Sequence, residues 1–155
     1  MRKKRSILLV FLLSIMSIVL FSACSESWAF NDRWNIQLPN SCFSEMQICR
    51  VEIGPDIISV KKCTNVSASM ISTYTLSPVD EDAELVFSRI KKILLEDYEW
   101  EQDAGKTTIE HIEIIGDIES TWDNLSYFYV EKFTTNYCLL LFDSSANLLY
   151  LCESY

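Results

Sequence analysis

The chain has 155 residues, of which 13 are basic and 22 acidic, and its formal net charge is −9. This balance excludes nucleic acid as a partner, because its binders carry stripes of Lys and Arg, and it disfavours docking on anionic lipid. The excess of acids indicates either solubility through mutual repulsion or attraction to a basic partner.

The first 23 residues have the three parts of an export signal. Basic residues occupy positions 2–5, an apolar run extends from Ile7 to Phe21, and Ser22 and Ala23 follow. At about 1.5 Å per residue the run spans roughly 22 Å, which is short of a hydrocarbon core of about 30 Å. Residues 1–23 are therefore predicted to be a signal peptide rather than a spanning helix, and the chain after them to be exported.

The end of this signal resembles the lipobox of bacterial lipoproteins, in the residues Phe21, Ser22, Ala23 and Cys24. That family usually has Leu where this chain has Phe21. The resemblance implies transfer of a diacylglyceryl group to the Cys24 sulfur, and cleavage before Cys24. It implies a lipid anchor on the extracytoplasmic side of the cell membrane, or in the outer membrane if the cell has one, because Ser25 rather than Asp follows. A cleaved signal without lipid and an uncleaved signal anchor are the alternatives.

Processing at Cys24 would leave a more acidic protein. Four basic and no acidic residues precede Cys24, so nine basic and 22 acidic residues remain and the formal charge becomes −13. Residues 24–32 are predicted to be the lipidated Cys and a short tether, in which Ser25–Asp32 reach at most roughly 28 Å. Residues 33–155 are predicted to be a single domain. The sequence leaves open whether Trp28 and Phe30 contact the lipid interface or pack on the domain.

Four strands are predicted in the first part of the domain, from alternating apolar and polar residues and from turn signals. They cover residues 34–38, residues 47–53, a segment from Ile58 onwards and residues 66–75. A turn at residues 54–56 would pair Ile53 with Ile58. In that register Cys49 and Cys63 lie on opposite faces of the sheet.

One amphipathic helix is predicted after these strands. Ser77 fits its N-cap, Pro78 fits its first position, and the acids that follow favour the positive end of the helix dipole. The helix is expected to end near Tyr98. Its apolar residues recur every three or four positions and form one stripe, which consists of Ala83, Val86, Phe87, Ile90, Ile93 and Leu94.

The rest of the chain is predicted to be strands. They cover residues 107–115, 122–133 with a break at residues 123–124, 136–142 and 148–152. A five-residue loop at 143–147 would set Cys138 directly opposite Cys152, within reach of a disulfide. The whole pattern predicts a two-layer α+β domain, with one amphipathic helix on a mainly antiparallel sheet of about six to eight strands. The apolar run 139–142 is expected in the centre of the sheet.

Five cysteines besides Cys24 lie in the exported part. In an exported domain this density favours disulfides, and their odd number leaves at least one unpaired within the chain. Cys138–Cys152 is the candidate pair, and Cys42–Cys63 is a weaker one. The spacings match no zinc module and the only His is His111, so neither a metal nor a cofactor is expected.

No catalytic arrangement is recognised in the sequence. A Cys–His pair would need His111 beside a cysteine, Gly-x-Ser-x-Gly does not occur, and three glycines make no phosphate-binding loop. The aromatic residues of 122–137 form either a stacking platform or part of the sheet packing. The leading hypothesis is a non-enzymatic binding module, held at the membrane by its lipid and interacting with a protein partner. The alternative is an extracytoplasmic hydrolase with an unrecognised carboxylate or Cys–His site.

Overall fold

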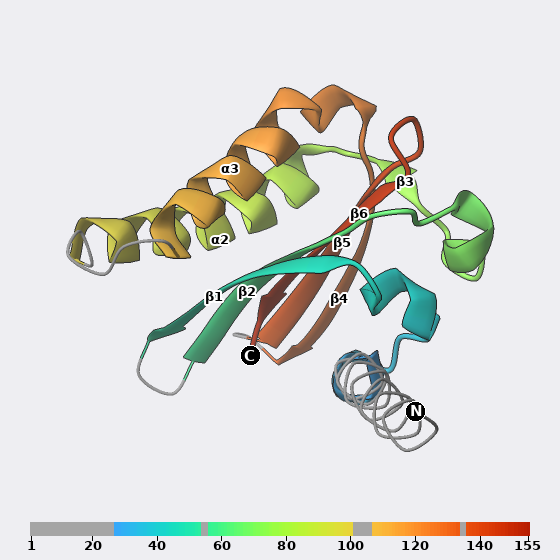
Figure 1. Cartoon of the computed structure of the whole chain (residues 1–155), viewed down its shortest axis with the longest axis horizontal. Helices are drawn as coiled ribbons and strands as arrows, with labels where there is room; N and C mark the ends of the chain where they lie inside the picture. Colours follow the sequence, from blue (N-terminus) through green and yellow to red (C-terminus); the bar gives the residue numbers. More distant parts are fainter. Residues whose placement is uncertain (1–26, 54–55, 101–106, 134–135) are drawn as a thin grey trace, which may run out of the picture.

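The computed structural model describes residues 27–53, 56–100, 107–133 and 136–155 (Figure 1). These residues form one antiparallel sheet of six strands in the order β1-β2-β6-β5-β4-β3. The strands are β1 (Met46–Ile53), β2 (Asp56–Cys63), β3 (Ser77–Pro78), β4 (Ser126–Phe133), β5 (Asn136–Asp143) and β6 (Leu148–Ser154). The α+β class with a mainly antiparallel sheet is confirmed, and the apolar run 139–142 lies in the interior strand β5.

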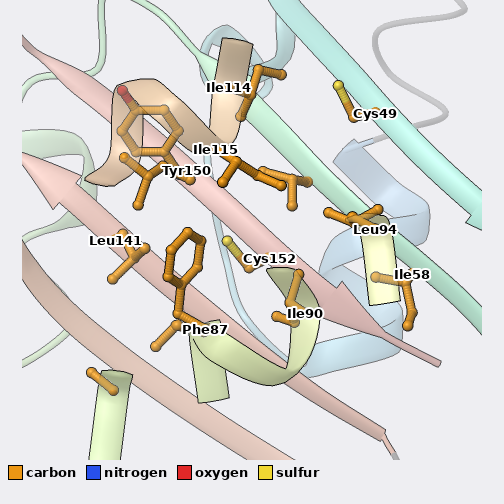
Figure 2. Close-up of a cluster of buried hydrophobic side chains, with 14 of the residues drawn as sticks. Cys49, Ile58, Phe87, Ile90, Leu94, Ile114, Ile115, Leu141, Tyr150 and Cys152 are labelled. Carbon is orange, nitrogen blue, oxygen red and sulfur yellow. The ribbon is translucent and has the colours of Figure 1, made fainter. Parts of the chain in front are cut away.

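Two helices, rather than the one predicted, cover the first face of the sheet (Figure 1). They are α2 (Glu81–Trp100) and α3 (Thr107–Ser120). The predicted stripe of α2 is confirmed, because Ala83, Phe87, Ile90 and Leu94 are buried and Val86 and Ile93 pack beside them. Figure 2 shows Phe87, Ile90 and Leu94 pointing into one cluster with side chains of the sheet and of α3.

The second face of the sheet is also covered, which the sequence did not indicate. Residues 27–34 form a helix, and the 3-10 helices η1 (Asn40–Phe43) and η2 (Ala68–Ile71) lie in the segments on either side of the β1–β2 hairpin. These segments and the sheet share a second cluster, which includes Phe30, Trp34, Ile36, Cys42, Val66, Ile71, Cys138, Leu140 and Leu151. The domain therefore has three layers rather than two.

The predicted tether is wrong in its second half. Phe30 is 1% exposed and packs against Phe43 at a ring-centroid distance of 5.7 Å, so it belongs to the domain. Trp28, by contrast, is 70% exposed. Cys24 lies outside the described residues, and only Ser25 and Glu26 separate it from residue 27, the first described residue of this helix.

Three predicted strands have other structures. Residues 107–115 belong to α3, where Ile114, Ile115 and Ile118 follow the helical period into the first core. The segment 34–38 buries alternate residues as expected but pairs with no strand of the described chain. The Asn31 side-chain amide instead accepts from the Leu38 N–H and donates to the Leu38 carbonyl, at 3.0 Å each. Residues 66–75 contain η2 and turns.

The N-terminus of α2 differs from its predicted position. Ser77 and Pro78 form β3, which pairs with Tyr127 and Ser126 of β4, so Ser77 is not the cap. The Asp80 carboxylate caps the helix by accepting from the N–H groups of Asp82 at 3.1 Å and Ala83 at 3.0 Å.

The register of the β1–β2 hairpin is shifted by two residues from the prediction, with Val51 opposite Ile58. A shift of two residues preserves the facing of every side chain. The predicted separation of Cys49 and Cys63 is therefore confirmed, since each belongs to a different core.

The register of the β5–β6 hairpin is shifted by one residue, and this makes the predicted Cys138–Cys152 neighbours wrong. Leu139 lies opposite Cys152, and Cys138 lies opposite Glu153. The physical reason lies in the loop, where the Asp143 carboxylate accepts from the backbone N–H groups of Ser145 and Ala146 and from the Ser145 hydroxyl. Asp143 therefore pairs with Leu148 and closes a four-residue loop. A one-residue slip exchanges faces, so Cys138 and Cys152 lie in different cores.

Within the described ranges, none of the helices combines the length and the apolar character that a membrane span needs.

Candidate functional site

The cysteines of the described chain do not form a reactive site. Cys42, Cys49, Cys63, Cys138 and Cys152 are present as thiols, and all are buried. Burial raises the pKa of Cys63 to about 12, with a further contribution from Cys42, which lies in the same core. Burial also raises the pKa of Cys138 and of Cys152 above the ordinary 9.0. Protonated, buried thiols are poor nucleophiles, so this arrangement does not favour a cysteine hydrolase. The Cys42–Cys63 disulfide stays a prediction.

The structure does not test the predicted Cys–His site, and it describes no metal site. His111 belongs to α3 rather than to a strand, and its side chain lies outside the described ones. Among the residues that the structure describes, no three His, Cys, Asp or Glu side chains gather into a metal site.

A buried carboxylate in β6 is the most unusual polar group of the described chain. Glu153 has an exposed fraction of 0%. Its Oε1 accepts from Arg33 Nη1 at 3.0 Å and from Trp34 Nε1 at 2.6 Å. Its Oε2 accepts from Ser59 Oγ at 3.1 Å and from Lys61 Nζ. Four donors occupy about all the lone pairs that a carboxylate offers, so Glu153 has no capacity left for a substrate.

The role of this Glu153 cluster is to hold the N-terminal segment against the centre of the sheet. Two donors come from the helix at residues 27–34, and two come from β2, the strand beside β6 in the sheet. The Arg33 guanidinium also lies 3.4 Å from the ring centroid of Tyr155. The sequence did not reveal this cluster, because its partners are separated by up to 120 positions.

The open edge of β4 is the feature that could receive a ligand. The short strand β3 pairs only with Ser126 and Tyr127. From Phe128 to Phe133, β4 has no strand beside its outer edge within the described chain. An unpaired edge presents backbone donors and acceptors that a further strand can use.

The backbone direction along this edge follows from one hydrogen bond. The Val79 N–H donates to the Leu125 carbonyl at 3.3 Å, so this carbonyl points towards β3, whereas the Leu125 N–H donates to the Trp122 carbonyl at 3.0 Å. Successive residues of a strand alternate between its two neighbours. Tyr127, Tyr129 and Glu131 therefore direct their N–H and carbonyl groups outwards, to the side on which the Leu125 carbonyl lies, and of these three only Tyr127 has a partner in β3.

A groove of about 270 Å³ runs between this edge and α2. One wall comes from β4 and the other from the first turns of α2. Its lining combines two tyrosine rings, apolar side chains and three charges, contributed by Asp82, Ala83, Leu85, Val86, Arg89, Tyr127, Tyr129 and Glu131. Leu85 is 53% exposed there. An exposed apolar side chain beside an open strand edge is typical of a binding surface.

Hydrogen bonds fix the tyrosines of the groove. The Tyr127 hydroxyl donates to Asp80 Oδ2 at 2.8 Å, which raises the pKa of Tyr127. Burial, followed by the charge of Glu131, raises the pKa of Tyr129. The ring of Tyr129 packs at 6.4 Å from that of Tyr137. Both phenols are therefore neutral near pH 7. Their rings line the groove in orientations that these contacts fix.

The aromatic residues of 122–137 were predicted to form either a stacking platform or part of the sheet packing. In the structure some of them line the groove and others pack in the two cores. Tyr127 and Tyr129 line the groove, whereas Phe128 packs against Tyr74 in the second core at 5.0 Å. Trp122 stacks on Phe87 at 5.2 Å on the helical side. Alternation within residues 126–131 is the sequence signal that could have separated the two groups.

No protein-family model, no curated protein and no solved structure matches this chain.

Proposed function

We propose that this chain is a lipid-anchored, extracytoplasmic binding protein without catalytic activity, and that its ligand is an extended peptide segment. The peptide adds to the outer edge of β4 as a further strand, and its alternate side chains enter the groove beside α2. The observation that carries this proposal is the outward direction of the Tyr129 and Glu131 backbone groups directly beside that groove.

The expected binding mode combines backbone pairing with side-chain selection. Each backbone hydrogen bond contributes a net of about 0.5–1.5 kcal/mol, and these bonds alone do not distinguish sequences. Selection comes from the groove, where Leu85 and Val86 favour an apolar or aromatic side chain. Asp82 and Glu131 outnumber Arg89, so a basic residue next to that side chain is favoured. The formal charge of −13 after processing at Cys24 acts in the same direction by attracting basic partners.

The other edge of the sheet is a weaker candidate for the same role. Among the described strands, β1 also has a neighbour on one side only, and Ile48 there is 39% exposed. The edge of β4 combines its open backbone with the tyrosines and the exposed Leu85 in one groove. A groove of this kind supplies specificity in addition to backbone pairing.

The strand-addition proposal is tested with Tyr129→Pro and its matched control Tyr129→Thr. Both variants lose the ring, but only Pro lacks the N–H. That N–H points away from β5, so its loss leaves the sheet intact. Peptides selected from a random display library on the acylated full-length protein in detergent micelles should bind Tyr129→Pro at least tenfold more weakly than Tyr129→Thr. Equal binding of both variants would show that the peptide does not pair with β4.

Partner capture addresses the choice between binding and catalysis. An affinity pull-down of the acylated protein from detergent extracts should recover a protein partner, and Tyr129→Pro should lose it. Recovery of no partner, together with turnover in a hydrolase screen, would overturn the proposal in favour of the enzyme.

The anchor has its own test in Cys24→Ala. Two or three acyl chains hold a protein durably at a membrane, because each buried CH₂ contributes about 0.8 kcal/mol. The variant should therefore move from the membrane fraction to the soluble fraction or retain its uncleaved signal, and mass spectrometry should find no diacylglyceryl group. A variant that is still cleaved after Ala23 and still remains in the membrane fraction would show that lipid on Cys24 is not the anchor.

A further inference from the structure

Trp28 is the most exposed large hydrophobic side chain of the described residues. It has an exposed fraction of 70%, whereas Phe30 and Trp34 in the same helix are 1% and 2% exposed. The helix at residues 27–34 therefore uses one face for the second core and presents Trp28 on the other. A tryptophan on the outer face of a helix contributes nothing to that core. Its exposure indicates that the ring contacts something outside the domain.

The position of Trp28 in the chain limits what that partner is. Four residue steps separate it from Cys24, and a fully extended chain covers about 13–14 Å in four steps. If Cys24 carries acyl chains, its sulfur lies at the boundary between headgroups and hydrocarbon. Trp28 is then held within reach of the headgroup layer in every arrangement of the intervening residues.

The surface around Trp28 has the chemistry of a headgroup contact. An open hollow of about 560 Å³ beside it is lined by hydroxyl and amide side chains and by one carboxylate, from Ser27, Asn31, Asp32, Asn35, Gln37 and Asn40. No lysine or arginine is among these residues. Amides and hydroxyls donate to phosphate and ester oxygens, and the absence of cations in this lining favours a zwitterionic over an anionic surface.

We infer that Trp28 enters the headgroup layer of the bilayer that holds the acylated Cys24, and that the helix at residues 27–34 lies against that surface. This inference rests on the proposed lipid anchor. Indole rings concentrate at this depth of a membrane, because the ring is apolar and its N–H still finds an acceptor. Trp28 is thus a second attachment point, which fixes the orientation of the domain that the acyl chains alone would leave to rotate.

The test is tryptophan quenching in vesicles. The acylated full-length protein is reconstituted in phosphatidylcholine vesicles with and without bromine on the acyl chains, since bromine quenches only tryptophans at the membrane. Bromination should quench the wild-type emission, and Trp28→Phe should abolish that loss. The matched control is Trp122→Phe, because Trp122 stacks on Phe87 at the helical side of the sheet and should leave the quenching unchanged.

The outcomes separate the inference from the anchor on which it rests. Acylated, vesicle-bound protein whose quenching is the same in Trp28→Phe as in wild type would overturn the contact and leave the anchor in place. Protein without acyl chains on Cys24 would overturn the anchor itself, and the inference with it. Quenching that also disappears in Trp122→Phe would place the opposite side of the domain at the bilayer and would equally overturn the inference.

Discussion

At the scale of single residues, the attachment of the N-terminal segment to the sheet depends on the buried carboxylate of Glu153. It joins two cations and two neutral donors, and its side chain is fully buried. A buried carboxylate with four partners is a fixed structural element, because any partner left alone would carry an uncompensated polar group out of water.

Glu153→Gln removes the charge and keeps the shape. Lys61, whose side chain is 5% exposed, then retains a buried charge without its carboxylate partner. Breaking a buried ion pair from one side costs about 3–5 kcal/mol, so the free energy of unfolding should fall by that amount in urea titrations. The control is Glu119→Gln, which breaks the exposed Lys91–Glu119 pair and should cost at most about 1 kcal/mol. Equal losses in the two variants would mean that the Glu153 cluster is not coupled to stability.

Asp80 gives the fold a dependence on pH. Backbone donation from Ala83, followed by the Tyr127 hydroxyl, lowers the pKa of Asp80 below its ordinary 3.8. A lowered pKa in the folded state contributes stability that is complete above 3.8 and is lost as pH falls through the folded value. Asp80→Asn should therefore lower the urea midpoint at pH 7, and the difference from wild type should shrink steadily on acidification below pH 4. If the difference in urea midpoint between wild type and Asp80→Asn grew on acidification, the lowered pKa of Asp80 would not be its cause.

At the scale of elements, the helix at residues 27–34 is part of the fold rather than of a tether. Phe30→Ala should cost about 3–5 kcal/mol, as for a fully buried ring. Trp28→Ala, two residues away and 70% exposed, should change the free energy of unfolding by no more than about 0.5 kcal/mol. Urea unfolding of both variants measures the contrast. If both substitutions change the free energy of unfolding by similarly small amounts, this segment would be a tether, as the sequence predicted.

Local patterns predicted those elements whose partners lie close in sequence. The stripe of α2 follows from periodicity, and the strands β4 to β6 follow from aromatic and apolar runs on either side of a loop signal. The facing of Cys49 and Cys63 survives a register error of two residues. The β5–β6 register failed because the Asp143 side chain, which the pattern ignores, shortens the loop by one residue. Residues 107–115 were mistaken for a strand because their β-branched residues suit strands, while burial against the first core selects the helix.

The candidate site was only partly predictable from the sequence, because its parts lie far apart along the chain. The tyrosines of residues 122–137 were recognised as a candidate platform, but the groove also needs α2 to lie beside the outer edge of β4. That edge exists because β3 has two residues, and nothing local separated Ser77 and Pro78 from a helix start. The Glu153 cluster likewise joins residues from both ends of the chain, which no local pattern relates.

At the scale of the whole molecule, both faces of the sheet are buried, one by α2 and α3 and the other by the N-terminal segment and the region of η2 (Figure 1). A protein whose sheet is closed on both faces can meet a strand-like partner only along an edge. The proposed membrane contact at Trp28 and the proposed peptide groove at Tyr129 use different parts of the surface. The two proposed sites share no lining residue.

The Glu153 cluster also determines how the molecule would respond to force. Arg33 and Trp34 join the helix beside the proposed anchor directly to β6, a strand with neighbours on both sides. A pull on a ligand held at β4 would reach this helix by two routes, through the hydrogen-bonded strands β5 and β6 to the carboxylate, and directly through Lys132 of β4, which donates to the Arg33 carbonyl. The domain would thus behave as a rigid handle between the ligand and the anchor.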